Sequence, residues 1–271
     1  MKKNLGLFLA IILVQIAPFI SAADTLYPLI YKIDIKKEIS NTTRLYLSNG
    51  LAEAYALGAD AVLIHMNTYG GQVDAADSMR TAILYNPIPV YVFIDNNAAS
   101  AGALISIACK KIYMRKGANI GAATVVNPTG EAMPDKYQSY MRSMMRSTAE
   151  AHGQDTIVQK NDTLYKWKRD PLIAEAMVDE RVAIPNLIDT GKVLTFTAQE
   201  AQKWGYCDGI AENPDEVITQ YLGYKDYKMK SSIPIQSHIL DIRDLQNVKR
   251  IFDESYFSVY SDHYYHRRYL F

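Results

Sequence analysis

The sequence predicts an α/β domain built on a mostly parallel sheet, and two patterns indicate this architecture. Short apolar runs, such as residues 61–67 and 88–96, alternate with segments whose apolar residues recur at helical spacing. Continuous apolar runs are typical of strands buried on both faces, and their alternation with helices requires crossovers that cover those faces. The chain has 271 residues, of which 49% are hydrophobic, which suffices for one large domain or two small ones.

The first half of the chain supplies the strand–helix alternation. Strands are predicted at residues 26–40, 61–67 and 88–96, with a further strand and a glycine-rich turn at 111–123. Helices are predicted between them at residues 41–58, 72–86 and 100–110. The second of these helices is expected to turn inward Val73, Ala76, Met79 and Ile83.

The second half is predicted to be mainly helical. A helix at 134–153, with Pro134 suited to its first position, presents on one face Tyr137, Met141, Met144, Met145 and Thr148. Two shorter helices are predicted at 170–181 and 197–210. The domain is therefore expected to cover residues 24–225, and residues 226–271 to form a polar, Tyr-rich tail of unknown structure.

The N-terminus has the three parts of a secretory signal. Lys2 and Lys3 precede an uninterrupted apolar core from Leu5 to Val14, and small residues follow at 21–23. The apolar core is shorter than the ~20 residues that span a bilayer. Residues 1–23 are therefore interpreted as a cleaved signal peptide of an exported protein, with an uncleaved anchor as the alternative.

Charge and cysteine content narrow the function classes. Lys plus Arg equals Asp plus Glu at 29 each, so no basic excess exists to bind nucleic acid. No Cys/His spacing suggests a metal site, and no cofactor is expected. Cys109 lies in an apolar setting typical of a buried free thiol, while a disulfide with Cys207 is permitted in an exported protein.

Gly70 and Gly71 stand between a predicted buried strand and a predicted helix. Glycines there let backbone N–H groups approach a bound group closely. A phosphate-binding loop is disfavoured because neither a G-x-G-x-x-G nor a Gly-Lys-Ser/Thr pattern is present. An oxyanion hole and an ordinary strand-to-helix turn remain as interpretations.

Ser100 occupies a second strand-to-helix junction, which should emerge at the same sheet edge. Small neighbours, Ala99, Ala101 and Gly102 among them, leave space for a substrate carbonyl around a nucleophilic serine. A helix N-cap is the structural alternative.

A nucleophilic serine requires a base. His65 lies inside a predicted strand and His152 at the end of a helix, which weakens a Ser-His-Asp triad. Lys136 begins the helix at 134–153, where the helix dipole and partial burial beside Met and Tyr side chains would disfavour its charged form. A solvated surface lysine is the alternative.

Six segments in order resemble the Clp-protease/crotonase superfamily, and more closely the membrane-associated ClpP-class serine proteases of the NfeD type. They are "GADAVLIHMNTYGGQVDAA", "IPVYVFIDNNAASAGALISIAC", "IYMRKGANIGAA", "DKYQSYMRSMMRSTAEAHG", "AEAMVD" and "LTFTAQEAQKWGYCDGIA". The resemblance covers roughly residues 26 to 222 and implies a ClpP/crotonase-like fold of repeated strand–strand–helix units. One departure is Tyr69, which stands where the family usually has proline and predicts a looser turn.

The resemblance also implies a site and a function. It places a serine–lysine dyad on Ser100 and Lys136 and the oxyanion donors on the N–H groups of Gly71 and Ala101. The residues expected to contact substrate are Gly70, Gln72 and Val73. The implied function is an exported endopeptidase of the periplasm or cell envelope, membrane-associated or not. It would cleave hydrophobic peptides or membrane proteins of the stomatin type, as a homo-oligomer.

Two other functions remain as alternatives to the endopeptidase. A crotonase-like enzyme acting on acyl-CoA would reuse the oxyanion hole, although an exported protein would rarely meet CoA. A non-catalytic scaffold would bind an extended peptide by strand addition. The presence of both Ser100 and Lys136 favours the peptidase.

We expect export to remove the first 22 or 23 residues, because the charged, apolar and small-residue regions match a cleavable signal. N-terminal sequencing of protein recovered from the cell envelope measures this directly. An intact Met1 on that protein would show the segment to be an anchor instead.

Overall fold

A mostly parallel sheet forms the centre of the computed structural model, which describes residues 27–159 and 162–233. The strands of this sheet are β1 (Leu29–Ile35), β2 (Ala61–Thr68), β3 (Val90–Ala99), β4 (Lys111–Met114), β5 (Asn119–Gly121), β8 (Thr195–Thr197), β9 (Gly209–Ile210) and β10 (Lys228–Ser231). Their main order is β10-β1-β2-β3-β4-β9, with every neighbouring pair parallel. Beyond β4, β5 pairs in parallel with the last three residues of β3, and it pairs antiparallel with β8.

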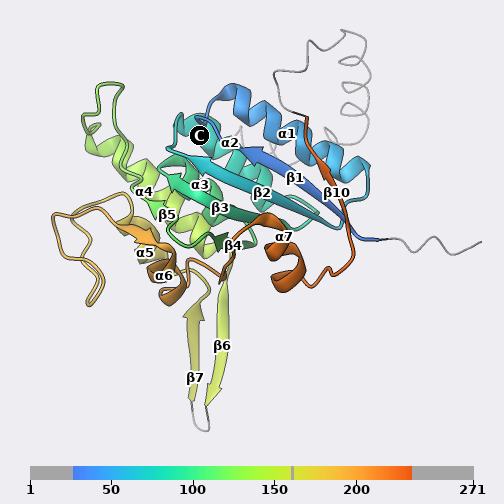
Figure 1. The fold of residues 1–271 in the computed structure, drawn as a ribbon. Helices are drawn as coiled ribbons and strands as arrows, with labels where there is room; N and C mark the ends of the chain where they lie inside the picture. The colour runs from blue at the N-terminus through green and yellow to red at the C-terminus, as the bar shows by residue number, and fades with distance from the viewer. Residues whose placement is uncertain (1–26, 160–161, 234–271) are drawn as a thin grey trace, which may run out of the picture.

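Helices cover the two faces of the sheet unequally. The helices are α1 (Asn41–Ala56), α2 (Val73–Leu84), α3 (Ala101–Ala108), α4 (Asp135–Glu150), α5 (Pro171–Ala176), α6 (Ala198–Lys203) and α7 (Pro214–Glu216), which continues into a π-helix at Val217–Tyr221. In Figure 1, α1, α2 and α3 lie on one side of the strands and α7 on the other. The predicted α/β architecture with a mostly parallel sheet is confirmed.

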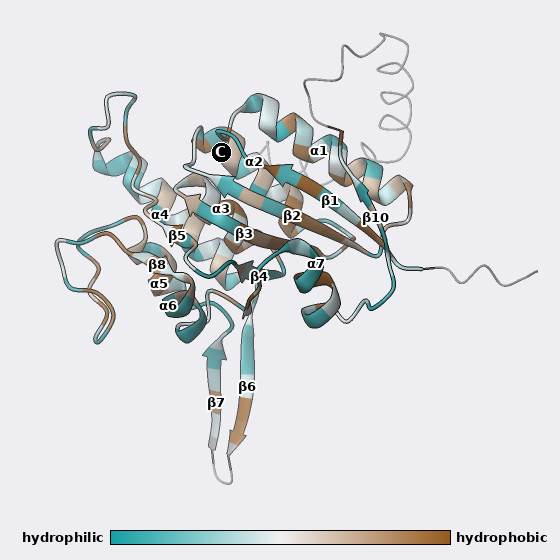
Figure 2. Cartoon of the chain, in the orientation of Figure 1, coloured by the Kyte–Doolittle hydropathy of each residue, from teal (hydrophilic) through white to brown (hydrophobic). Residues whose placement is uncertain are grey.

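The alternation of side chains along the central strands builds a core on each side. On β2, Ile64 and Met66 join the large core beneath α1–α3, while Leu63 packs with Phe93 and Val217 on the other side. Both sets are fully buried, which explains why these strands are apolar without interruption. Figure 2 shows the hydrophobic colour concentrated along the central strands.

Several predicted details need correction. Pro134 is the residue before α4 rather than its first helical residue. Met141, Met144 and Met145 face the core as expected, but Tyr137 is 42% exposed because the first turn of α4 extends beyond the core. The sheet also continues past residue 225, since β10 pairs with β1 from Leu29 to Lys32.

The sequence analysis did not anticipate a hairpin of β6 (Gln154–Gln159) and β7 (Asp162–Trp167). The two strands form a separate antiparallel sheet that projects away from the body of the molecule (Figure 1). Arg169 lies just after the hairpin and is buried, and its guanidinium donates hydrogen bonds to the carbonyls of Ile107 and Cys109 at 2.7 and 2.8 Å. This arginine ties the base of the hairpin to the end of α3.

Two sequence interpretations concern chemistry outside the site. Cys109 and Cys207 are both free and buried, so the thiol interpretation of Cys109 is confirmed and the two do not pair.

Between residues 27 and 233, no described helix combines the length and apolar character needed to cross a bilayer. The predicted signal peptide and all but the start of the predicted tail lie outside the described residues.

Candidate active site

Ser100 is the single residue between β3 and α3 and has a backbone conformation that L-residues rarely adopt. Its φ is 54° and its ψ is −119°. Its N–H donates to the carbonyl of Gly121 at 2.9 Å, and its carbonyl accepts from the N–H of Ala103 at 2.9 Å. Its side chain makes no capping hydrogen bond, although the residue sits at the N-cap position of α3. Strain of this kind collects at functional sites, and the capping interpretation does not account for it.

The glycine turn lies directly against Ser100. A Cβ built on Gly70 would be 2.6 Å from Cβ of Ser100 and 3.1 Å from its Oγ. A Cβ on Gly71 would be 2.0 Å from the carbonyl oxygen of Ile39. Both glycines also have positive φ, at 108° and 151°. The turn is therefore tightly packed, in contrast to the looser turn expected from Tyr69, whose side chain is 81% exposed.

The hydrogen bonds around Gly71 orient its N–H group. Ile39 donates to the carbonyl of Gly70 and accepts from the N–H of Gln72, both at 2.8 Å. In this parallel bridge the N–H of Gly71 points away from Ile39. Ala101 is the first residue of α3, where N–H groups have no partner within the helix. The backbone thus supplies two candidate oxyanion donors on segments that flank Ser100.

The remaining residues expected to contact substrate continue the glycine turn. Gln72 is exposed, precedes α2 and accepts a hydrogen bond on Oε1 from the N–H of Asn41 at 3.2 Å. Val73 is the first residue of α2 and is half-buried. Both side chains are therefore accessible beside the turn.

Lys136 lies in the first turn of α4 and is exposed. Its Nζ sits 4.9 Å from the centre of the Tyr137 ring. The expected burial among methionine side chains is wrong, because Met141 and Met144 point from later turns of α4 into the core. Among the interactions of the described residues, none joins Lys136 to Ser100. Gly121, whose carbonyl accepts the hydrogen bond from the N–H of Ser100, precedes the segment that leads to α4.

Histidine does not supply the base among the described residues. His152 contacts the carbonyl of Ile107 at 2.6 Å, at the far end of α3 from Ser100, about 10 Å along the helix. Burial and the nearby Arg169 guanidinium lower the pKa of His152 to about 4. This histidine is therefore a neutral packing residue and not a partner of the serine.

His65 is held on the other side of the sheet. Its ring nitrogens lie 3.2 Å from Asp34 and 3.1 Å from Asp95, and its ring packs at 5.4 Å from that of Phe93. Phe93 belongs to the core opposite α3. His65 is therefore a strand residue whose Nε2 hydrogen-bonds Asp95, while its Nδ1 lies near Asp34 without a hydrogen bond.

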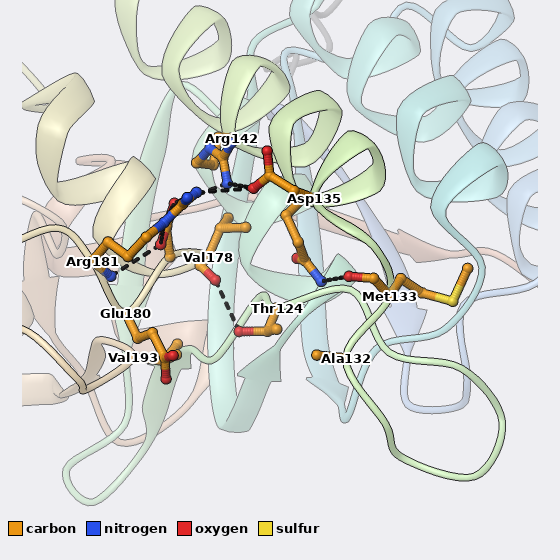
Figure 3. A pocket seen from close by; sticks show the side chains of 11 residues that line it. Thr124, Ala132, Met133, Asp135, Arg142, Val178, Glu180, Arg181 and Val193 are labelled. Carbon is orange, nitrogen blue, oxygen red and sulfur yellow. Dashed lines mark hydrogen bonds and ion pairs between the residues drawn. The ribbon is translucent and has the colours of Figure 1, made fainter.

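A cavity of about 270 Å³ opens beside the start of α4 (Figure 3). It is lined by Thr124, Ala132, Met133, Asp135, Gln138, Arg142, Val178, Asp179, Glu180, Arg181 and Val193. Backbone hydrogen bonds connect the walls of the cavity to Gly121, which binds Ser100. Ala122 and Ala123 follow Gly121, and their N–H groups donate to the carbonyls of Leu194 and Met177 at 3.0 and 2.6 Å. Sequence reasoning missed these residues because they come from three separate segments.

Four of the five charged side chains that line the cavity are paired with one another. The guanidinium of Arg181 hydrogen-bonds Asp179 at 2.7 Å, and Arg142 reaches the same carboxylate at 2.8 Å. The hydrogen bonds from Arg181 lower the pKa of Asp179 to about 2. No group of His, Cys, Asp and Glu suited to a metal ion occurs among residues 27–159 and 162–233.

Known proteins resemble this chain in sequence and in fold. The family model for "NfeD1b, N-terminal domain" matches residues 29–232. Membrane protein NfeD1b of Bacillus subtilis (strain 168) is 31% identical over 197 residues, covering 72% of this chain and 41% of that protein. Membrane-bound protease PH1510 of Pyrococcus horikoshii is 25% identical over 222 residues, covering 79% of this chain and 43% of that protein. The chain thus spans less than half the length of these relatives.

Solved structures of the 1510-N membrane-bound stomatin-specific protease, from Pyrococcus horikoshii, share the fold. A serine-to-alanine variant aligns with a TM-score of 0.61 and 22% identity over 76% of this chain and 98% of that chain. A lysine-to-alanine variant in complex with a substrate peptide aligns with a TM-score of 0.62 and 22% identity over 76% and 93%. The predicted ClpP-like fold and the resemblance to the NfeD type are confirmed.

We predict that Gly70→Ala destabilises the protein more than Gly58→Ala. At Gly58, φ is 65°, within the left-handed region, where alanine costs roughly 1 kcal/mol, whereas φ of Gly70 is 108°, outside that region, where the backbone strain of alanine is larger. At Gly70 the new methyl group would also press on Ser100, whereas nothing lies within 4 Å at Gly58. Denaturant unfolding of both variants measures the difference. Equal losses would show that the turn does not pack on Ser100 as described.

Proposed function

Because the chain belongs to the NfeD1b N-terminal domain family, we propose that it is a ClpP-like serine endopeptidase acting through Ser100 and Lys136. The observation that carries the proposal is the strained Ser100, packed against Gly70 with an uncommitted hydroxyl. Homology to PH1510, named a membrane-bound protease, supports the same reaction class. Variants of the 1510-N protease that replace a serine and a lysine support a role for these residue types.

In the proposed mechanism, Oγ of Ser100 attacks the carbonyl carbon of the scissile peptide. Neutral Lys136 takes the hydroxyl proton on Nζ, and the N–H groups of Gly71 and Ala101 bind the oxyanion. As the tetrahedral intermediate collapses, the C–N bond breaks and the leaving amine takes the proton from Lys136. Water then attacks the acyl–serine ester and gives a proton to neutral Lys136. As the second tetrahedral intermediate collapses, the bond to Oγ breaks and Lys136 returns the proton to Oγ, which releases the acid and free Ser100.

Lys136 is assigned this role because it is the lysine that the resemblance to the NfeD-type proteases matches. It is the only lysine between Lys116 and Lys160 in the sequence. In the 1510-N protease, the serine and the lysine that the variants replace lie farther apart in sequence than Ser100 and Lys136 do here. The segment that connects serine and lysine is therefore shorter in this chain. Lys136 must leave the Tyr137 ring to reach Ser100, as catalytic contacts often tighten only in the substrate complex.

The proposed substrates are extended, apolar peptides, including segments of stomatin-like membrane proteins. Ile120 and the methionines of α4 are buried in the core and are not available to line a binding site for such peptides. The cavity beside α4 instead supplies apolar surface from Met133, Val178 and Val193. The stomatin assignment rests on the printed specificity of the 1510-N protease, and export to the cell envelope on the signal-like N-terminus.

The two alternatives have less support. A peptide-binding scaffold has no need for a strained serine with a free hydroxyl, and an acyl-CoA enzyme would not require Lys136.

Relatives are named membrane proteins, which supports association of this chain with a membrane.

We also propose that the chain forms a homo-oligomer through the β6–β7 hairpin. A two-stranded sheet is marginally stable in water unless a further surface packs on it. On one face of this hairpin, Val158 is 79% exposed, Tyr165 is 67% exposed and Trp167 is 36% exposed. A second copy of the chain could bury these side chains.

The dyad is tested by the kinetics of four variants on an apolar peptide and a charged peptide of equal length. Ser100→Ala should abolish turnover, and Lys136→Ala should lower kcat roughly 10²–10⁴-fold by removing the base. Lys136→Arg should be as inactive, because a guanidinium stays protonated. Lys116→Arg, an exposed lysine outside the site, is the control and should match wild type.

Near-normal cleavage by Lys136→Arg would place the base elsewhere. Wild type should favour the apolar peptide, and equal or reversed cleavage would contradict the proposed substrate class.

The oligomer is tested by changing Val158 and Tyr165 together to Ser. Sedimentation velocity should show a smaller assembly than wild type, because the exposed apolar face is lost. Lys166→Ser, on the other face of the same strand, is the control. An unchanged assembly in the double variant would assign the oligomer to another surface.

A further inference from the structure

Four charged side chains join the first turn of α4 to the segment after α5, and we call Asp135, Arg142, Asp179 and Arg181 the ionic clasp. Arg142 donates from one terminal nitrogen to Asp135 at 3.1 Å and to Asp179 at 2.8 Å. Arg181 also bridges the two carboxylates, reaching Asp135 at 2.9 Å and Asp179 at 2.7 Å. Figure 3 shows both arginines converging on Asp135. Each cation thus binds both anions.

Burial distinguishes the clasp from an ordinary surface ion pair. The side chains of Arg142 and Asp179 are only 12% and 9% exposed, whereas those of Arg181 and Asp135 are 65% and 64% exposed, so the clasp is half-buried. Asp179 also accepts hydrogen bonds from the N–H and Nε of Arg181, both at 2.9 Å. Isolated exposed pairs contribute little, whereas a partly buried network with shared partners holds a defined geometry.

The clasp acts on the one part of α4 that the core does not fix. Apolar packing of α4 begins at Met141, and Pro134 offers no side-chain cap to the start of the helix. Besides the clasp, the first turn is held by Gln138, whose amide pairs with the N–H and carbonyl of Val125 at 2.9 and 2.7 Å. Asp135 is the residue directly before Lys136.

We propose that the ionic clasp positions Lys136 for catalysis, with Arg142 and Asp179 as positioning residues that do not touch the reacting atoms. The inference rests on the proposed Ser100–Lys136 dyad. The clasp ties Asp135 to the segment after α5. Because Lys136 directly follows Asp135, the clasp also sets the position of the Lys136 Cα atom. Because Ala123 binds Met177 and follows the strand that binds Ser100, the same frame holds the serine. The positions of Ser100 and Lys136 are thereby both tied to the segment of residues 177–181.

The test compares Arg142→Gln with Arg146→Gln. Arg146 lies one turn later on α4 and pairs with Glu175 at 3.0 Å, a carboxylate that Arg142 also approaches at 3.9 Å. Loss of Arg146 therefore weakens the docking of α4 on α5 and leaves the hydrogen bonds of the clasp to Asp135 and Asp179 in place. Arg142→Gln should lower kcat on the apolar peptide roughly 10- to 100-fold with KM little changed, because misplacing a catalytic group has this effect. Arg146→Gln should retain wild-type kcat. Hydrogen exchange at residues 135–140 should quicken only in Arg142→Gln.

Two further measurements make the outcomes decisive. In a Lys136→Ala background, Arg142→Gln should change the residual kcat less than about twofold, because a clasp that acts through Lys136 has nothing left to position. Arg181→Gln, at a side chain 65% exposed, should lower kcat in the same direction by less and serves if Arg142→Gln does not fold.

Three results would overturn the inference. Equal kcat in Arg142→Gln and Arg146→Gln, with Lys136→Ala inactive, would leave the dyad standing and remove the clasp from catalysis. A rise in KM at constant kcat would mean that Arg142 binds substrate directly. Wild-type activity of Lys136→Ala would reject the dyad itself, and the clasp inference with it.

Discussion

The close packing of Gly70 against Ser100 is the constraint on which the rest of the site depends. A side chain at Gly70 would collide with Ser100, and one at Gly71 would collide with the backbone at Ile39. The turn can therefore approach the serine only as glycine, and the parallel bridge between Gly71 and Ile39 leaves the N–H of Gly71 pointing away from Ile39. On the other side, the carbonyl of Gly121 in β5 accepts the N–H of Ser100. The backbone of the serine is thus held between the glycine turn and β5.

The serine and the lysine are held by different physical means. Ser100 is set by backbone hydrogen bonds at the carboxyl ends of parallel strands, which are buried on both faces and have little freedom to move. Lys136 stands on a helical turn outside the core, next to an aromatic ring and beside a network of ion pairs. A preformed nucleophile facing a base that must move is consistent with a peptidase whose contacts complete on substrate binding. The cavity beside this helix is lined by residues of α4, Asp135 and Gln138 among them, and its lining includes no residue of β3 or α3.

The sequence predicted the parts of the fold whose signal is local. The strand at 61–67 and the helix at 100–110 were predictable because their continuous apolar runs report burial directly. The proximity of Gly70 to Ser100 was predictable because strand-to-helix junctions of a parallel sheet share an edge. The β6–β7 hairpin was missed because its apolar residues remain exposed and its strands pair outside the main sheet. The ion pairs of Arg142 were equally hidden, since nothing in a sequence shows that residues 37 positions apart, such as Arg142 and Asp179, will meet. The expected burial of Lys136 was wrong because a helical face predicts direction and not where the core ends.

The most direct measurement is covalent labelling with a fluorophosphonate probe followed by peptide mapping. The probe forms a phosphonate ester with an activated serine hydroxyl and releases fluoride, so it reports the reactivity of the nucleophile without requiring the natural substrate. The account predicts a single modified peptide that carries the label on Ser100, absent in Ser100→Ala and strongly reduced in Lys136→Arg. A protein that remains unlabelled, or a label on another serine that persists in Ser100→Ala, would contradict the assignment of Ser100 as the nucleophile.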